Sequence, residues 1–432
     1  MANEKNTPSD VNAQGFSRRG LIKAGGTAVA AAAVQQMLPG TAFAAGGAPE
    51  VKGAKLGFIA LTDAAPLIVA KELGLFAKYG MPDVIVAKQA SWGATRDNLV
   101  LGSGGGGIDG AHLLTPMAYF LTLGVQARAT PMSILARLDV NGQGISVDKA
   151  YLGAKADLNA GKMKGLIEQR KAAGRKITMA MTFPGGTHDL WLRYWLAAGG
   201  IDPDKDVSLI TIPPPQMVAN MRADTMDAFC VGEPWNEQLV TQQLGYTAVS
   251  TGQIWMNHPE KSFAMRSDWV AAHPNAAVAL TTAIIEAQRW ADSPANISRL
   301  AMMISGRDYL KCPVGDIASR LQGNFNFGDG RHITNAPFKM KFFANNASFP
   351  YKSHDLWFLT EEQRWGKLPI GLNKTAAIAK VNRSDIWRTA AAKLGVHGPA
   401  GDSRGPERFF DGKVFDPGNP AAYLHSLAIK RV

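Results

Sequence analysis

The sequence predicts an α/β fold of two lobes, on the basis of three observations. The chain has 432 residues, which is enough for two domains of ~100–200 residues each. Short apolar runs alternate with longer amphipathic segments, as in parallel sheets covered by helices. The alternation forms two blocks, because the chain crosses between them near residues 140–150 and returns near residues 247–255. Two such units with a cleft between them are typical of proteins that close over a ligand.

The first block alternates strands with helices. Strands are expected over Lys55–Leu61, Val84–Lys88, Ile108–His112 and Ser133–Leu138. Helices are expected over Ala64–Leu73, Ala94–Leu101 and Pro116–Leu123. Gly74 follows the first of these helices and is a natural stop signal. The order predicts a parallel sheet.

The second block repeats the pattern. Strands are expected over Lys176–Met181, Ser208–Ile212 and Met226–Val231. Helices are expected over Asp157–Gly174, Thr187–Ala198, Gln216–Arg222 and Asn236–Leu244. The rest of the chain reads as more helical and irregular, with helices over Asn275–Asp292 and Ser353–Trp365. The span from Cys312 to Phe349 is rich in Gly, Asn and Phe, and we expect long loops there.

Residues 1–44 have the pattern of a twin-arginine export signal. Arg18 and Arg19 precede an apolar stretch, Ala24–Val34, and a small-residue cleavage site, Ala42-Phe43-Ala44, follows it. The apolar stretch is too short for a membrane span, which needs ~20 apolar residues. We therefore expect an exported, periplasmic protein in which residues 45–54 are a linker. No cysteine follows the cleavage site, so no lipid anchor is expected.

Composition and charge narrow the class of function. Hydrophobic residues make up 46% and charged residues 19%, which is ordinary for a folded soluble protein. The net charge of +11 is dispersed without a Lys/Arg run, which disfavours nucleic acid as a partner and leaves an anionic ligand or a basic solvated surface. Cys230 and Cys312 have no metal-ligand spacing, so no zinc site is expected. We expect two buried free thiols, and a single disulfide between them is the alternative.

Five residues are candidates for holding a small anion. Such an ion needs oriented donors in a dry cleft, and helix N-termini supply them. The candidates are Trp92 as a wall, Gly93 for close backbone approach, Gln143 between two glycines, His188 and Lys261. Thr187 is a natural N-cap, which would place His188 in the first turn of a helix, partly exposed in the open cleft. Each residue alone has an ordinary structural explanation; Lys261, for example, could pair with Glu260 at the surface.

The sequence indicates a catalytic site less clearly than it indicates an anion-binding site. The sequence has no GxSxG, GxxxxGK[ST] or HExxH pattern. The glycine run over 102–107 follows a predicted helix and lacks the lysine of a phosphate loop, so it predicts a turn. The acidic stretch over 202–206 lacks the spacing of a calcium loop. No catalytic residue, metal or cofactor is therefore expected.

The residues resemble the solute-binding proteins of nitrate and bicarbonate ABC importers. The matching segments cover nearly all of residues 55–365 and include Ala65–Glu72, Phe76–Val84, Ser91-Trp92, Thr95–Asn98, Ile108–His112, Ile134–Leu138, Trp191–Gly200, Met226–Phe229, Glu233-Pro234-Trp235 and Tyr351–Leu359. The resemblance implies a two-lobed type II periplasmic-binding fold. It implies one lobe from residues 55–145 and 253–432, with a C-terminal extension, and a second from residues 146–252.

The resemblance also implies a ligand. In nitrate-binding members a tryptophan, a glutamine, a histidine and a lysine surround the ion; Trp92, Gln143, His188 and Lys261 stand in those motifs, with Gly93 as a backbone donor. Bicarbonate-binding members have an acidic residue and calcium in place of the lysine, and a glutamine in place of the histidine. Nitrate or nitrite, passed to an ABC permease, is thus the expected ligand. Alternatives are a bicarbonate or sulfonate receptor, or an enzyme on the same fold such as a pyrimidine-precursor synthase.

Overall fold

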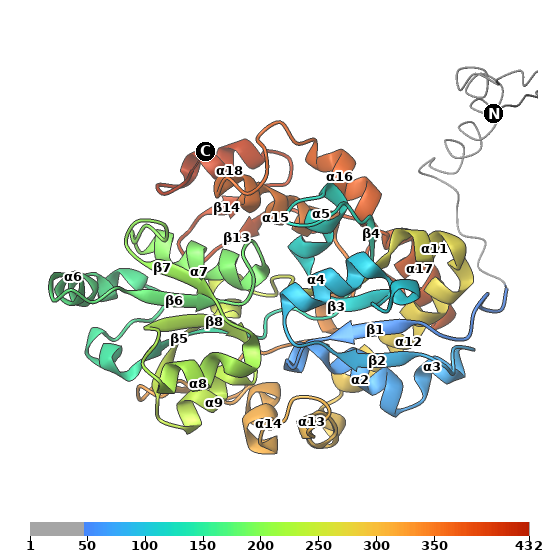
Figure 1. Cartoon of the computed structure of the whole chain (residues 1–432), viewed down its shortest axis with the longest axis horizontal. Helices are drawn as coiled ribbons and strands as arrows, with labels where there is room; N and C mark the ends of the chain where they lie inside the picture. The colour runs from blue at the N-terminus through green and yellow to red at the C-terminus, as the bar shows by residue number, and fades with distance from the viewer. Residues whose placement is uncertain (1–46, 432) are drawn as a thin grey trace, which may run out of the picture. The chain divides into compact units, whose positions relative to one another are not determined.

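The computed structural model describes residues 47–431 of the chain, and the predicted export signal and the first two linker residues lie outside them. Two five-stranded sheets form the framework of the described chain (Figure 1). The strand orders are β2-β1-β3-β10-β4 and β7-β6-β8-β5-β9. Helices cover both sheets, so the predicted α/β architecture with two units is confirmed. No helix among the described residues is long and apolar enough to cross a membrane.

The first sheet holds strands from both ends of the fold. Its strands are β1 Lys55–Phe58, β2 Ile85–Lys88, β3 Gly110–Leu114, β4 Met132–Arg137 and β10 Lys261–Arg266. The helices of this lobe include α2 Ala65–Glu72, α3 Leu75–Lys78, α4 Trp92–Leu101, α5 Thr115–Leu123, α11 Ser267–Ala272, α12 Pro274–Ala291 and α13 Ile297–Ser305. β1 runs parallel to β2 and β3, whereas β10 runs antiparallel to β3 and β4.

The second sheet has the same plan. Its strands are β5 Gln143–Asp148, β6 Thr178–Met181, β7 Ser208–Thr211, β8 Ala228–Gly232 and β9 Gly245–Ser250. Its helices are α6 Lys164–Ala172, α7 Thr187–Ala198, α8 Met217–Arg222, α9 Trp235–Thr241 and α10 Thr251–Ile254. β6 runs parallel to β7 and β8, and β5 runs antiparallel to β8 and β9.

The prediction of purely parallel sheets is wrong, because each sheet contains one antiparallel strand. β5 and β10 follow directly on the passages of the chain from one lobe to the other. A strand that enters its sheet from the other lobe needs no crossover helix, so nothing forces it to run parallel. Such a strand is also not flanked by long segments with helical periodicity, and it was these segments that marked the other strands in the sequence. These two strands, with β9, are the ones that the alternation did not predict.

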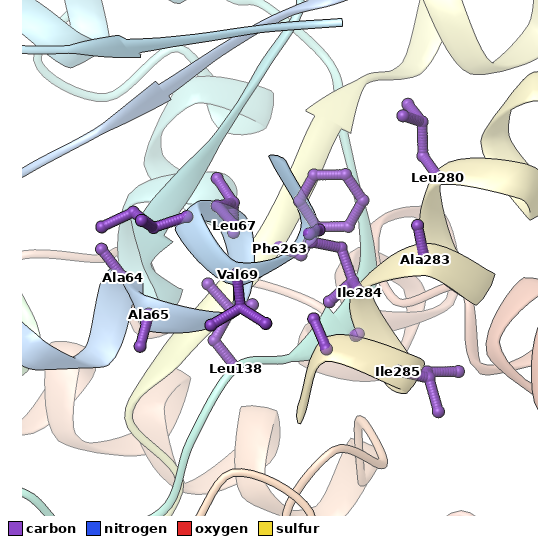
Figure 2. Packing of buried hydrophobic residues seen from close by; sticks show 14 of the residues in the cluster. Ala64, Ala65, Leu67, Val69, Leu138, Phe263, Leu280, Ala283, Ile284 and Ile285 are labelled. Atoms are coloured by element: carbon purple, nitrogen blue, oxygen red, sulfur yellow. The ribbon is translucent and has the colours of Figure 1, made fainter. Parts of the chain in front are cut away.

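The core of the first lobe lies between its sheet and two helices. Small and branched apolar side chains of α2 and α12 interdigitate against β10 (Figure 2). Leu67, Phe263 and Ile284 are fully buried in this layer. Each such side chain contributes about 1.5–3 kcal/mol to folding through burial. The many alanines of α12 allow α2 to approach it closely.

The C-terminal helices bind to both lobes. They are α15 Lys352–Arg364, α16 Lys374–Val381, α17 Ser384–Lys393 and α18 Pro420–Ser426. Asp355 of α15 forms a buried ion pair with Arg137 of β4 in the first lobe. Trp357, half a turn later, stacks on Trp191 of α7 in the second lobe, with ring centres 4.9 Å apart. Helix α15 therefore crosses the boundary between the lobes.

The segment from Cys312 to Phe349 is only partly loop. It contains the helix α14 Val314–Gln322 and a small hairpin, β11 Phe325–Asn326 with β12 His332–Ile333. The expectation of loops throughout is thus wrong for α14, where Ile317 and Leu321 sit four residues apart on one buried face. Both cysteines are free and buried, as predicted.

Gly107 permits a close approach that no other residue would allow. The glycine run over 102–107 forms the predicted turn, and a Cβ atom at Gly107 would lie 2.0 Å from the carbonyl oxygen of Asn98. We expect Gly107→Ala to lower the free energy of unfolding by about 1–3 kcal/mol, as overpacking does. Gly104→Ala is the matched control, because a Cβ there meets nothing within 4 Å. Urea denaturation of the two variants measures the difference, and equal values would contradict the steric argument.

Candidate ligand-binding site

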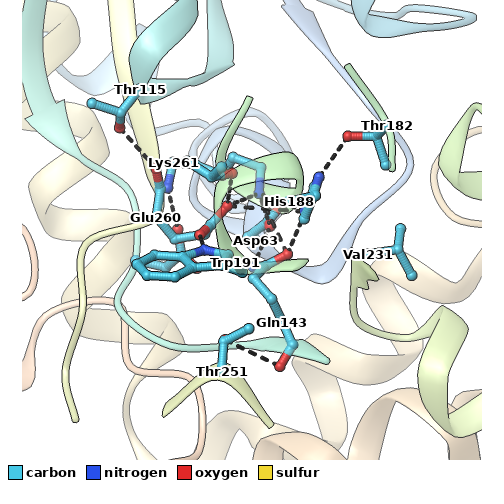
Figure 3. A network of polar contacts seen from close by, with 12 residues as sticks. Asp63, Thr115, Gln143, Thr182, His188, Trp191, Val231, Thr251, Glu260 and Lys261 are labelled. Carbon is cyan, nitrogen blue, oxygen red and sulfur yellow. Dashed lines mark hydrogen bonds and ion pairs between the residues drawn. The ribbon is translucent and has the colours of Figure 1, made fainter. Parts of the chain in front are cut away.

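Three of the predicted side chains meet at one point between the lobes. His188 Nε2 lies 2.7 Å from Gln143 Oε1, and Lys261 Nζ lies 3.5 Å from the same oxygen (Figure 3). Lys261 Nζ and His188 Nε2 are 3.4 Å apart. All three residues are buried. Two donors thus converge on one oxygen, which is the arrangement that an oxyanion requires.

Each of these residues stands at the start of an element. Gln143 and Lys261 are the first residues of β5 and β10, the strands that follow the passages between the lobes. His188 is the second residue of α7, just after the turn that ends β6. The strand ends and the helix N-terminus therefore gather side chains from both lobes at a single place, where an α/β fold usually binds its ligand.

Trp92 and Gly93 lie at the N-terminus of α4. The Trp92 side chain is fully buried, and its ring centre is 5.9 Å from Lys261 Nζ. The Ser91 hydroxyl accepts from Ala94 N at 3.1 Å and Ser91 O accepts from Thr95 N, so the Trp92 and Gly93 N–H groups of this first turn have no acceptor within the helix. A Cβ at Gly93 would meet only Ser91 Oγ, at 3.7 Å. The protein's own packing therefore does not demand a glycine there.

Three carboxylates surround Lys261, and the sequence pointed only to Glu260 among them. Asp63 Oδ2 lies 2.9 Å and Glu260 Oε1 2.8 Å from Lys261 Nζ, and Asp139 Oδ1 accepts the Lys261 backbone N–H at 3.0 Å. The pairing with Glu260 at the surface that we considered is in fact a fully buried pairing. Asp63 comes from a short turn of helix and carries no motif, so no sequence signal could have found it.

Two expectations about α7 are wrong. Thr187 is not the N-cap but the first helical residue, and the cap is Gly186. The Thr187 hydroxyl donates to Glu260 instead, together with Trp191 Nε1 at 2.7 Å. His188 is fully buried instead of partly exposed, because the two lobes meet over it and Gln143 fills the space in front of its ring.

Burial and the local charges shift the pKa values of this network. Burial lowers the pKa of Lys261, but Asp63 and Glu260 outweigh it and raise that pKa above its usual value. Burial opposes the charged form of Asp63, yet Lys261 and His112 hold its pKa well below the usual range. Burial raises the pKa of Asp139 well above its usual value, and it also raises that of Glu260. A buried ammonium–carboxylate pair therefore stands at the centre of the site.

The histidine at the site is neutral. Burial, followed by the charge of Lys261, lowers the pKa of His188 well below its usual value. Burial likewise lowers the pKa of His112, whose Nε2 lies 2.6 Å from Asp63 Oδ1. His188 therefore acts as a neutral donor to Gln143 Oε1 through Nε2 in this state.

The lobes are closed over the site. A cavity of about 10 Å³ lies beside Gln143, lined also by Thr62, Ser250 and Arg320, and its volume is no larger than about one water molecule requires. A polyatomic ligand therefore enters only when the lobes separate or Gln143 moves. No group of three or more His, Cys, Asp or Glu side chains within residues 47–431 is arranged to hold a metal ion.

Several known proteins are similar to this chain in sequence and fold. The model of the NMT1-like family matches residues 47–305. The nitrate/nitrite binding protein NrtA of Synechococcus elongatus is 54% identical over 96% of this chain and 99% of its own length. The bicarbonate-binding protein CmpA of the same organism is 44% identical over 88% of both chains.

A solved structure agrees with these matches over nearly the same span. The crystal structure of the periplasmic nitrate-binding protein NrtA from Synechocystis PCC 6803 superposes with a TM-score of 0.86 at 55% identity, covering 89% of this chain and all of that one. The predicted type II periplasmic-binding fold is thereby confirmed. The chain belongs to the NMT1-like family, and within it to the solute-binding proteins of nitrate and bicarbonate importers.

Proposed function

We propose that this protein is a periplasmic receptor for nitrate or nitrite, held by Trp92, Gly93, Gln143, His188 and Lys261. The observation that carries the proposal is the convergence of Lys261 Nζ and His188 Nε2 on Gln143 Oε1. All three residues are buried, and we call the buried polar region around Lys261 the chamber. The Gln143 oxygen occupies the position that an oxygen of the anion takes on binding. The amide then turns away, and Gln143 Nε2 becomes a further donor to the ion.

Lys261 favours nitrate or nitrite over bicarbonate with calcium. A fixed ammonium attracts a monoanion directly, whereas a carboxylate in its place needs a metal ion between itself and the anion. The Trp92 ring, 5.9 Å from the ammonium, adds a flat apolar wall against which a planar ion can lie. The five proposed binding residues include no nucleophile with an adjacent base, so a receptor is favoured over an enzyme on this fold.

The two lobes enclose the ion, and the export signal directs the protein to the periplasm. We assign residues 55–145 and 253–432 to one lobe and residues 146–252 to the other, with the ion between them, except that residues 143–145 begin strand β5 and residues 253–254 end helix α10 of the second lobe. Arg18 and Arg19 direct the folded chain to the periplasm through the twin-arginine route. There the closed form docks on the permease of an ABC importer, which is its only contact with the membrane. No cofactor takes part.

Calorimetric titration of the chain from residue 45 onward tests this function. Sodium nitrate, sodium nitrite and sodium bicarbonate are each titrated with and without calcium. We expect saturable binding of nitrate or nitrite that calcium does not change. Bicarbonate binding that requires calcium, or heat from none of the three salts, would contradict the proposal.

A further inference from the structure

The chamber around Lys261 has more acidic groups than basic ones. Asp63 and Glu260 both pair with the Lys261 ammonium, and Asp139 accepts the Lys261 backbone N–H. The ammonium is already matched by two carboxylates at 2.8–2.9 Å. An arriving anion therefore adds a negative charge to a buried region whose positive charge is already balanced, and such an excess is costly in a dry interior.

The groups that face His188 come from several elements. His188 Nε2 is 3.4 Å from Lys261 of β10 and 3.9 Å from Glu260, which precedes that strand. The other charged or titratable groups of the chamber are Asp63 of the turn after β1, His112 of β3, Asp139 after β4, Cys230 of β8 and His258 before β10. Burial raises the pKa values of Asp139 and Glu260. Glu260 accepts hydrogen bonds from Lys261 Nζ, the Thr187 hydroxyl and Trp191 Nε1, and a proton added to this carboxylate would disturb these contacts.

His188 is built to hold two protons. Its Nδ1 lies 2.5 Å from Thr182 Oγ1, and a hydroxyl can either donate to that nitrogen or accept from it. Its Nε2 already donates to Gln143 Oε1, and an anion oxygen would accept in the same way. Both ring N–H groups of a protonated His188 thus have acceptors in place.

The other two histidines are less suited. His112 Nδ1 accepts from the Ile59 backbone N–H at 3.5 Å, a donor that cannot reverse its role, so a second proton would break that contact. His258 is bonded through its ring nitrogens to Pro259 O and Thr251 Oγ1, and so it does not face the oxygen of Gln143 that the anion replaces.

We propose that the site takes up one proton together with each anion, and that His188 holds this proton on Nδ1 with the Thr182 hydroxyl as its acceptor. This inference rests on the proposed nitrate function. The proton comes from the solvent, and the nitrate ion is unchanged. The bound anion screens His188 from Lys261 and gives the new imidazolium a direct partner, so the ion and the proton stabilise each other.

The sign of the pH dependence follows from this linkage. His188 is neutral in the free protein because its pKa is well below the usual value, and the bound anion raises that pKa. Between the free and the bound pKa, nitrate affinity therefore falls about tenfold for each unit of rising pH. Above the bound pKa the affinity becomes independent of pH and no proton is taken up.

The test measures protons directly. Sodium nitrate is titrated calorimetrically into the protein in two buffers of different protonation enthalpy, at several pH values from 5 to 9, with sodium chloride as the control salt. We expect the observed enthalpies to differ between the buffers by an amount that corresponds to uptake approaching one proton per nitrate at the lower pH values. Nitrate binding with equal enthalpies in both buffers and a flat pH profile would overturn the inference and leave the nitrate function intact. Heat from nitrate at no pH would instead remove the function on which the inference rests.

Two variants assign the proton to His188. His188→Gln keeps a neutral donor of similar reach, and we expect it to bind nitrate more weakly with no proton uptake and no pH dependence. Thr182→Val keeps the side-chain shape but removes the acceptor on Nδ1, and we expect its fall in affinity to begin at a lower pH than in the parent protein. Thermal melting checks that both variants fold. Proton uptake that persists undiminished in a folded His188→Gln variant would overturn the assignment in favour of a carboxylate.

Discussion

Nitrate binding is expected to disappear when Lys261 is replaced by glutamate. The change substitutes a carboxylate for an ammonium that already faces Asp63 at 2.9 Å and Glu260 at 2.8 Å, so an anion would meet only negative charge. Lys261→Met, which removes the charge and keeps the length, is expected to weaken binding by about 30- to 4000-fold, the range for truncating one partner of a buried charge pair. Calorimetric titration with sodium nitrate measures both effects.

The site is fully buried, so folding has to be measured alongside binding. Both variants leave buried carboxylates without their cation, and we expect their melting temperatures to fall as well. Lys205→Met is the matched control, because the Lys205 side chain is 71% exposed and forms an ion pair with Asp202 on the surface. A Lys261→Met variant that folds and binds nitrate as tightly as the control would show that the ammonium is not a ligand.

Trp357→Ala is expected to be the most destabilising single truncation in the C-terminal helices. The indole is fully buried, stacks on Trp191 at 4.9 Å, packs against Trp255 at 5.1 Å and donates to the Tyr423 hydroxyl at 3.1 Å. Replacing such a side chain by alanine costs about 3–5 kcal/mol through lost burial and the cavity left behind. Urea denaturation followed by circular dichroism measures the loss.

A partly exposed tryptophan provides the comparison. Trp269 of α11 contacts His273 and lies at the edge of the first lobe's core. We expect Trp269→Ala to cost less than half as much as Trp357→Ala. Similar losses for the two variants would mean that the aromatic cluster between the lobes contributes no more than ordinary packing.

The sequence was sufficient for the parts of the fold that follow a period. Helix α7 begins and ends where predicted, because its apolar positions repeat at helical spacing and two glycines follow it. The strands β1, β2 and β6 were placed within a few residues for the corresponding reason. β5, β9 and β10 were missed, because each is followed only by a short helical segment of four to six residues, which is too short to show a helical period in the sequence.

Three of the candidate side chains could be brought together from the sequence, but the groups that surround them could not. Gln143, His188 and Lys261 meet as the family resemblance implied, although the sequence separates the first from the last by 118 positions. Asp63 and Asp139 could not be found, because a lone aspartate in a strand-end turn has the same local pattern whether it faces solvent or a buried ammonium. The full burial of His188 was also hidden, since it depends on how two lobes meet and not on any local period.

Helix α15 carries one buried contact to each lobe, and this restricts how the lobes can separate. Asp355 is fixed to Arg137 in one lobe, and Trp357, two residues on, is fixed against Trp191 in the other. These anchors lie about 3 Å apart along the helix axis, so the helix cannot stretch to follow a gradual opening. Either contact must break as a whole, and packed interfaces of this kind switch between arrangements instead of deforming smoothly. The helix thus couples any separation of the lobes to the loss of one buried contact, either the Asp355–Arg137 ion pair or the Trp357–Trp191 stack.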